Sequence, residues 1–244
     1  MALNPMHQFE VYKIGPEINL GGVNLSFTNA TLFMLISAIL ISSLLFFGTK
    51  KKLLIPSKLQ LITEMSYTFV AKMINETAGS SARSFFPFIF TLFMFVLFCN
   101  MVGMLPYSFT VTSHIIVTFV LAAVVFIGVT VIGFIKHGVK YLELFVPKGV
   151  PVVLLPLIII IEIISYLSRP VSLSVRLFAN MMAGHTMMKV FGGFVISLGL
   201  LGGWLPLSFS VALTGLEILV AFLQAYVFAI LTCIYLNDAL NLHH

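Results

Sequence analysis

Residues 84–135 contain no lysine, arginine, aspartate or glutamate. A helix needs about 20 mostly apolar residues to cross the hydrocarbon core of a membrane, so this run is long enough for two crossings. The polar stretch NMVGMLPYSFTVTSH interrupts the run in its middle. The run therefore predicts a hairpin of two membrane-spanning helices, at residues 85–105 and 113–135.

The rest of the chain is also unusually apolar. Hydrophobic residues make up 60% and charged residues 9% of the 244 positions, and the mean hydropathy is +1.12. A soluble domain has an apolar share of only roughly 45–50%. We therefore expect an all-α integral membrane protein that forms a single membrane domain over residues 1–244. Cys99 and Cys233 lie in apolar runs without metal-binding spacing, so we expect packing residues rather than a disulfide or a metal site.

The remaining runs complete a set of about five spanning helices and one amphipathic surface helix. The other expected elements are an outer segment at 1–26, a spanning helix at 27–48, the amphipathic helix at 57–78, and a hairpin of two long tilted helices at 150–191 and 204–237. The segment 57–78 has apolar residues at helical spacing but carries too many charges to span. Packing of this helix on protein stays open as an alternative. The turn between the last two helices is expected at Gly192, Gly193, Gly199, Gly202 and Gly203.

The lysines indicate which side the loops face. They follow the first apolar run and the hairpin, as Lys50, Lys51, Lys52, Lys136, Lys140 and Lys148. Loops rich in Lys and Arg stay on the cytoplasmic side, so the N-terminus is expected outside and the C-terminus inside. This clustering also argues against nucleic acid as a partner for the net charge of +5. The start MALNPMHQFEVYKIGP resembles neither a secretory signal nor a transit peptide, so we expect insertion from the compartment of synthesis.

A row of polar side chains, the first polar row, runs along the first of the two long helices. At 3.6 residues per turn the row falls within an arc of about 80°. Its members are Glu162, Ser165, Arg169, Ser172, Arg176 and Asn180. The second polar row, on the last helix, consists of Ser210, Thr214, Glu217 and Gln224. Both rows are expected to face protein or water, because an ionisable group at a helix centre costs roughly 2.5–3.5 kcal/mol in lipid.

Arg176 has no acidic residue within a turn on either side. Glu162, on the same face, lies about 21 Å away along the helix axis, so the counter-charge is expected from another helix or another chain. His185 comes nine positions after Arg176 and therefore on the opposite side of the helix, in a different environment. A packed neutral imidazole is an open alternative for His185. Arg169 is expected to extend toward the head groups.

The other polar residues also have structural interpretations, and these stay open. Arg176 could form a permanent ion pair with Glu217, although a static pair needs no row of hydroxyl and amide groups around it. Glu162 could be a satisfied carboxylate near the inner membrane interface. Asn180 and Gln224 could simply hydrogen-bond across helices, as amides often do in membranes.

Two segments of the chain resemble a known family. RPVSLSVRLFANMMAGH and ALTGLEILVAFLQAYVFAILTCIYLND are similar to the last two helices of subunit a of the F-type ATP synthase. Supporting stretches are PMHQFEVYKIG and FCNMVGMLPYSFTVTSHI, and the resemblance covers essentially the whole chain. It implies a non-catalytic membrane subunit, the stator half of a proton path, with no cofactor and no metal. The chain also lacks a Gly-rich phosphate loop, so no nucleotide site is expected.

The resemblance implies a function for the middle of the first polar row. Arg176 matches the essential arginine that faces a membrane carboxylate on each rotor subunit and keeps two half-channels apart. Asn180 and Gln224 match the polar residues that flank it.

It also implies two offset half-channels that couple proton flow to rotation and ATP synthesis. Glu217 and His185 match a pair that serves the outer half-channel. Glu162, Ser165 and Ser172 would serve the inner one.

The implied partners are the rotor ring of subunit c, peripheral-stalk subunit b, other ATP synthase subunits and membrane lipid. The implied location is a bacterial plasma membrane, or a mitochondrial inner membrane for an organelle-encoded chain. An autonomous channel or a secondary transporter is a rival interpretation, but no matching pair of interrupted segments is visible. A purely structural anchor is a second rival, and it would have no use for the two polar rows.

Overall fold

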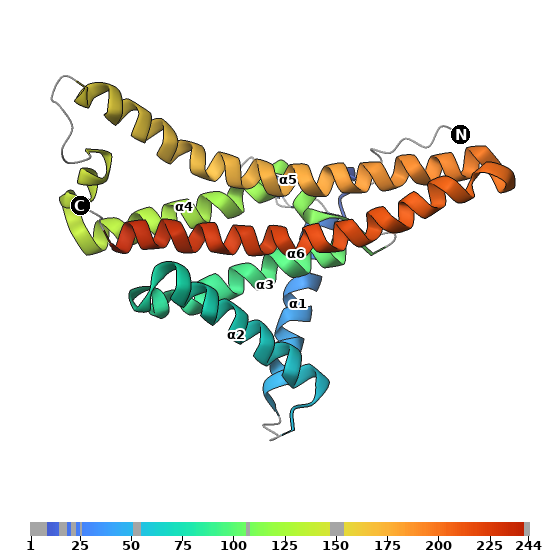
Figure 1. Ribbon diagram of the computed structural model, residues 1–244, viewed down its shortest axis with the longest axis horizontal. Coiled ribbons are helices and arrows are strands. Elements are labelled where there is room, and N and C mark those ends of the chain that lie inside the picture. Colours follow the sequence, from blue (N-terminus) through green and yellow to red (C-terminus); the bar gives the residue numbers. More distant parts are fainter. Residues whose placement is uncertain are drawn as a thin grey trace. The chain divides into compact units, whose positions relative to one another are not determined.

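A computed structural model describes residues 9–14, 19–20, 23–24, 26–50, 55–105, 108–146 and 154–241 (Figure 1). Its α-helices are α1 (Asn29–Lys50), α2 (Lys58–Ala78), α3 (Phe86–Gly103), α4 (Ile115–His137), α5 (Leu155–Gly202) and α6 (Trp204–Leu240). Short 3-10 helices occur at η2 (Ser80–Phe85), η3 (Val111–Ser113) and η4 (Gly138–Phe145). Strands β1 (Asn19–Leu20) and β2 (Val23–Asn24) pair antiparallel.

Within the described ranges, five helices are long and apolar enough to cross a membrane: α1, α4, α5, α6 and the segment Ser81–Gly103 that contains α3. This confirms the predicted all-α fold with about five spanning helices. A helix suits lipid because it satisfies its backbone hydrogen-bonding groups internally. Helices α1 and α4 each begin and end two residues later than the sequence predicts. The short strands and η4 are additions that the sequence did not indicate.

Helix α2 is not among the five spanning candidates. Its start is capped by Ser57, whose Oγ accepts a hydrogen bond from the backbone N–H of Gln60 over 3.3 Å. Aromatic contacts join it to neighbouring rings: Tyr67 packs on Phe86 with centroids 4.6 Å apart, and Phe69 packs on Phe93 at 5.7 Å. One face of α2 is therefore packed on protein, as the alternative interpretation allowed. Its position at the membrane surface remains a prediction.

Helix α5 is longer than predicted, because it continues through Gly192 and Gly193 to Gly202. Two glycines in a helix cost only about 1 kcal/mol each relative to alanine, which the surrounding apolar residues can offset. The departure from helical geometry comes later, at Gly199, with φ 61° and ψ −159°. The backbone N–H of Gly203 then bonds to the carbonyl of Gly199 over 2.9 Å, and α6 begins at the next residue.

The structure divides into two compact units, which we describe separately. Unit 1 comprises residues 1–63, 94–114 and 177–226. In it the second part of α5 lies antiparallel to the first part of α6, and the rings of Phe191 and Phe209 stack with centroids 6.0 Å apart. The end of α3 joins them through Asn100, whose Nδ2 donates to the carbonyl of Ala221 over 3.2 Å. Unit 1 therefore brings three helices together around residues 177–226.

Unit 2 comprises residues 64–93, 115–176 and 227–244. It holds a partly buried chain of hydroxyl groups, in which Tyr166 Oη lies 2.6 Å from Thr130 Oγ1 and 3.1 Å from Tyr141 Oη. Lys136 Nζ donates to the carbonyl of Leu240 over 2.9 Å, so a cation from α4 satisfies the last turn of α6.

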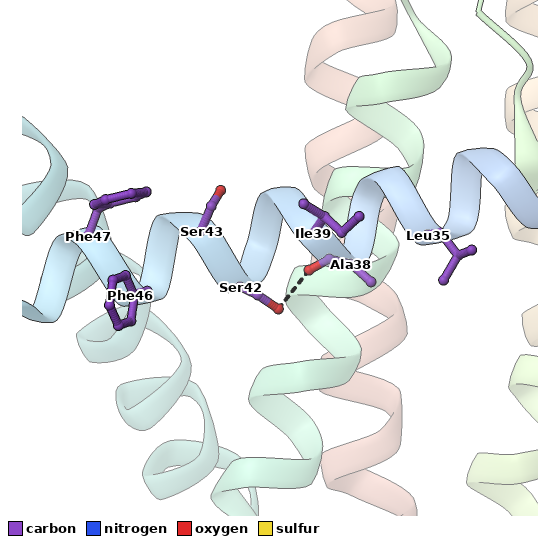
Figure 2. A pocket seen from close by; sticks show the side chains of 7 residues that line it. All are labelled: Leu35, Ala38, Ile39, Ser42, Ser43, Phe46 and Phe47. Atoms are coloured by element: carbon purple, nitrogen blue, oxygen red, sulfur yellow. Dashed lines mark hydrogen bonds between the residues drawn. The ribbon is translucent and has the colours of Figure 1, made fainter.

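A shallow depression of about 550 Å³ lies on α1. Its lining consists of Leu35, Ala38, Ile39, Ser42, Ser43, Phe46 and Phe47 (Figure 2). The hydroxyl of Ser42 donates to the carbonyl of Ala38 in its own helix over 2.8 Å, as the dashed line in Figure 2 shows. The lining contains no ionisable side chain, so this depression offers no step for moving a proton.

Candidate functional site

His185 and Glu217 form a buried pair in unit 1. His185 Nδ1 on α5 lies 3.6 Å from Glu217 Oε1 on α6, and the side chains are 8% and 6% exposed. The approach depends on Gly184, because a Cβ built there would lie 2.7 Å from Glu217 Oε1. The family resemblance had implied that these two residues form a pair, whereas spacing along the chain alone did not bring them together.

The carboxylate of Glu217 has no hydrogen-bond donor among the described residues. Both of its oxygens are buried, and no residue in the described part of the chain donates a hydrogen bond to them. A buried polar atom without a partner costs roughly 1–3 kcal/mol. Such a group calls for an explanation, and a function in proton transfer is one of those that proteins use. This carboxylate and the imidazole of His185 are two neighbouring groups, each of which can take up and release a proton.

The second ring nitrogen of His185 also has a partner. His185 Nε2 lies 3.0 Å from Thr110 Oγ1, in the connection between α3 and α4, and both residues are buried. Sequence reasoning did not identify Thr110 as a site residue. The signal available for it was the run of hydroxyl side chains at Thr110, Thr112 and Ser113, next to His114 and between two apolar helices.

Asn180 and Gln224 form the second cross-helix pair of unit 1. Asn180 Nδ2 donates to Gln224 Oε1 over 2.8 Å. Gln224 is buried, and its Nε2 has no hydrogen-bond partner in the described ranges. The open interpretation of these amides as a cross-helix hydrogen bond is thus correct as geometry. A further function at the unpaired Nε2 remains compatible with it.

Arg176 is exposed on α5. Within its own unit, no described residue makes a hydrogen bond or an ion pair with its guanidinium. Glu217, the partner considered for a static ion pair, is paired with His185 instead. The chain therefore presents Arg176 outward.

The rest of the first polar row is also largely open. Ser165 and Ser172 are exposed and Glu162 is half-buried. The carbonyl of Ser165 accepts a hydrogen bond from Ser168 Oγ over 2.7 Å, while the Ser165 hydroxyl makes no bond to a described residue. The row thus forms a polar, accessible face on an otherwise apolar helix.

Arg169 is the one member of the first polar row that has an acidic partner in the described residues. Its Nη1 donates to Asp238 Oδ2 over 3.2 Å, and its guanidinium lies over the rings of Tyr166 and Tyr235 at 5.4 and 5.0 Å. The expectation that Arg169 extends toward the head groups stays a prediction, to which the structure adds this acidic partner. Asp238 is 69 positions further along the chain, and no spacing or motif indicates that it approaches Arg169.

No group of three or more His, Cys, Asp or Glu side chains lies together in the part of the chain that the structure describes. The described residues therefore build no metal centre. The chemistry that they offer is proton exchange at His185 and Glu217 and charge compensation at Arg176.

Known proteins give an independent comparison. Residues 31–237 match the family model described as "ATP synthase A chain". A protein of Pelagibacter ubique named "ATP synthase subunit a" is 77% identical over 244 residues, which is 100% of both chains. A protein of the same name from Rhizobium rhizogenes is 60% identical over 247 residues, covering 99% of this chain and 98% of its own. A third, from Chelativorans sp., is 58% identical over 250 residues and 100% of both chains.

Proposed function

The chain belongs to the family of ATP synthase subunit a, and from that premise we propose that its two polar rows carry protons to and from a rotor. The chain is a multi-pass membrane subunit of the Fo sector of a proton-translocating ATP synthase and forms a complex with the other subunits of that enzyme. The finer assignment concerns which residues act, on which side, and against which partner.

Arg176 is the residue that we assign to the rotor. A rotor carboxylate surrounded by lipid favours its neutral form because it is desolvated, whereas a fixed guanidinium beside it favours the ionised form. The exposure of Arg176 supports this assignment, as does the lack of an ion-pair partner among the described residues of its own unit. In this arrangement each carboxylate of the subunit c ring would lose its proton before it passes Arg176.

His185 and Glu217 would serve the outer half-channel. Their separation of 3.6 Å and their burial support direct proton exchange, because a small rotation of either side chain brings them into hydrogen-bond range. During ATP synthesis, a proton from outside would pass through this pair and neutralise a rotor carboxylate that leaves Arg176. The neutral carboxylate could then enter lipid.

Glu162, Ser165 and Ser172 would serve the inner half-channel. Their spacing on one face of α5 and the exposure of both serines support a wetted path along that face. Each charge that moves through the membrane potential releases about 2.3 kcal/mol per 100 mV. With two offset half-channels, this work is released only when the rotor turns.

The remaining proposals concern orientation and neighbours. The lysines after α1 and α4 support an outer N-terminus and an inner C-terminus. The exposed first polar row would face the subunit c ring. Subunit b of the peripheral stalk would hold the chain against rotation.

The observation that carries this proposal is that Arg176 is exposed and makes no ion pair with a described residue of its own unit. The test is Arg176→Ala in the whole complex, reconstituted in vesicles, with ATP-driven proton pumping and passive proton flux measured. We expect pumping to be lost, with or without a passive leak. The matched control is Arg83→Ala, which removes another exposed arginine and should pump normally. Normal pumping by the Arg176 variant would refute the proposal.

A further inference from the structure

The imidazole of His185 is held at both nitrogens, and the two partners differ in chemistry. Nδ1 faces a carboxylate oxygen of Glu217 at 3.6 Å, and Nε2 faces the hydroxyl oxygen of Thr110 at 3.0 Å. A neutral imidazole carries one N–H and one lone pair, so the partner of one nitrogen decides the state of the other. The hydroxyl proton of Thr110 therefore matters for the Glu217 side.

That proton has an acceptor of its own. Thr110 Oγ1 lies 3.2 Å from the carbonyl oxygen of Gly103, to which it donates. Gly103 is the last residue of α3, and the last four carbonyls of a helix lack a helical partner. The hydroxyl of Ser108, which has one proton to donate, also points to this turn: its Oγ lies 2.9 Å from the carbonyl oxygen of Gly103 and 2.7 Å from that of Leu105. The end of α3 thus attracts hydroxyl protons toward itself and away from His185.

The close approach of Thr110 to α3 is built into the backbone. A Cβ at Gly103 would lie 2.8 Å from Thr110 Cγ2 and 3.1 Å from its Oγ1. At the other end of the imidazole, a Cβ at Gly184 would collide with Glu217. Two glycines therefore make room for the two partners of His185, which fixes the plane and the direction of the ring.

We propose that Thr110 is a positioning residue that selects the tautomer of His185. Thr110 donates its single hydroxyl proton to the carbonyl of Gly103, so its oxygen can only accept a hydrogen bond from His185. Nε2 of the neutral ring therefore carries the N–H. Nδ1 is then the bare nitrogen, aimed at Glu217 as a proton acceptor. A proton carried by Glu217 can pass to Nδ1 and return, with the O–H bond broken as the N–H bond forms. Thr110 itself exchanges no proton in this step.

This inference rests on the proposed function, in which His185 and Glu217 pass protons. It adds that the α3–α4 connection, which lies outside both polar rows, determines which nitrogen of the imidazole accepts a proton. If the tautomer of His185 did not affect proton transfer, the same contacts of Thr110 would only stabilise the packing. The experiment must therefore include a readout that packing alone would leave unchanged.

The first measurement needs no substitution at Thr110. Solid-state 15N NMR of the complete complex, labelled with 15N-histidine and held at a pH where the ring is neutral, reports which imidazole nitrogen is protonated. The His185 signal is identified by its loss in His185→Gln. We expect protonated Nε2 and bare Nδ1. A ring with protonated Nδ1 would overturn the inference.

The second measurement compares variants of the complex in vesicles at a fixed proton-motive force. Thr110→Val keeps the shape and removes the hydroxyl, and we expect ATP synthesis to fall about fivefold to tenfold, the size of effect that one lost hydrogen bond produces. Thr110→Ser should restore the rate to within about twofold of wild type, and its ring should again show the N–H at Nε2. The matched control is Thr232→Val, because the buried hydroxyl of Thr232 donates to the carbonyl of Phe228 in its own helix and to no other described residue.

The outcomes separate this inference from the proposed function. If Arg176→Ala abolishes pumping while Thr110→Val synthesises ATP at the wild-type rate, the positioning role is wrong and the proton path stands. If pumping does not depend on Arg176, the proposed function fails. Should Thr110→Val not assemble, the tautomer of the unsubstituted complex still decides the question.

Discussion

Asn180 and Gln224 join the two long helices through one hydrogen bond, with Nδ2 of Asn180 donating to Oε1 of Gln224 over 2.8 Å. The two ends differ in burial, since Gln224 is 4% exposed and Asn180 belongs to the open face of α5. Asn180 can find water or another chain when the bond is broken, whereas the amide of Gln224 cannot. The bond therefore stabilises the pair unequally.

This asymmetry predicts which of two substitutions destabilises the complex more. Asn180→Leu leaves the whole buried amide of Gln224 unpaired, which costs about 1–3 kcal/mol. Gln224→Leu removes the buried amide together with its need for partners, so the complex should lose less stability. The measurement is the temperature at which the purified complex releases this chain. Equal losses, or the reverse order, would show that burial does not govern the pair.

Removal of the charge of Glu217 should stop proton transfer. Glu217→Gln keeps the size of the side chain but can no longer release a proton, and groups that transfer protons typically contribute a hundredfold or more to a rate. ATP-driven acidification of vesicles, followed with a fluorescent pH probe, should fall by about that factor. Glu76→Gln is the control, because Glu76 is exposed and its ion pair among the described residues is a surface i,i+4 pair with Lys72 at 3.8 Å. Acidification at the wild-type rate by the Glu217 variant would exclude it from the path.

A methyl group added at Gly184 should disturb the pair of His185 and Glu217 by steric contact. In Gly184→Ala the new Cβ would lie 2.7 Å from Glu217 Oε1 and 3.0 Å from its Cδ, so the carboxylate must move away from its present position. We expect proton transport to fall about tenfold, since a displacement of about 1 Å can cost up to a hundredfold in a reaction that depends on position.

The control for this substitution lies on the same helix. At Gly192 an added Cβ meets no atom within 4 Å, and Gly192→Ala also raises helix propensity. That variant should transport protons normally. Similar losses in both variants would mean that the effect comes from the helix backbone and not from Glu217.

His114 gives the connection between α3 and α4 a dependence on pH. Its ring stacks on Phe109 with centroids 4.9 Å apart, and burial lowers its pKa from the ordinary value of 6.5. A lowered pKa means that the folded chain binds this proton more weakly than the unfolded chain does. The stability that His114 contributes is thus present above pH 6.5 and is lost as the pH falls through its lowered pKa.

The test compares the heat stability of the complex between pH 5 and pH 8 for wild type and His114→Gln. The amide of glutamine has no proton to gain in this range, so the variant should lose less stability on acidification. Parallel curves for the two proteins would refute this assignment.

The helices of this chain were readable from the sequence because lipid imposes a simple rule. An uncharged apolar run of about 20 residues has few options other than a spanning helix, so α1, α3 and α4 follow directly from composition. The end of α5 was harder to predict. Gly192 and Gly193 favour a turn locally, but the helix tolerates them, and the backbone departs from helical geometry only at Gly199.

The candidate site could be predicted from the sequence only in part, because helical periodicity reports only on residues close together in the chain. The periodicity of 3.6 residues placed Arg176 and Asn180 on one face of one helix, because that relationship is local. The partners of His185 are not local, since Thr110 lies 75 positions before it and Glu217 comes from another helix. Spacing along the chain holds no information about such meetings. The ion pair of Arg169 with Asp238 was missed for the same reason.

The outward guanidinium of Arg176 has a consequence for the life of the chain before assembly. A copy inserted alone would present this group to lipid at a cost of roughly 2.5–3.5 kcal/mol, together with the hydroxyl groups of Ser165 and Ser172. In the proposed complex, docking of a partner on that face would remove the cost. An unassembled copy and an assembled copy therefore differ in how much polar surface they expose to lipid. Quality control in the cell could use this difference to decide which copies are degraded and which are kept.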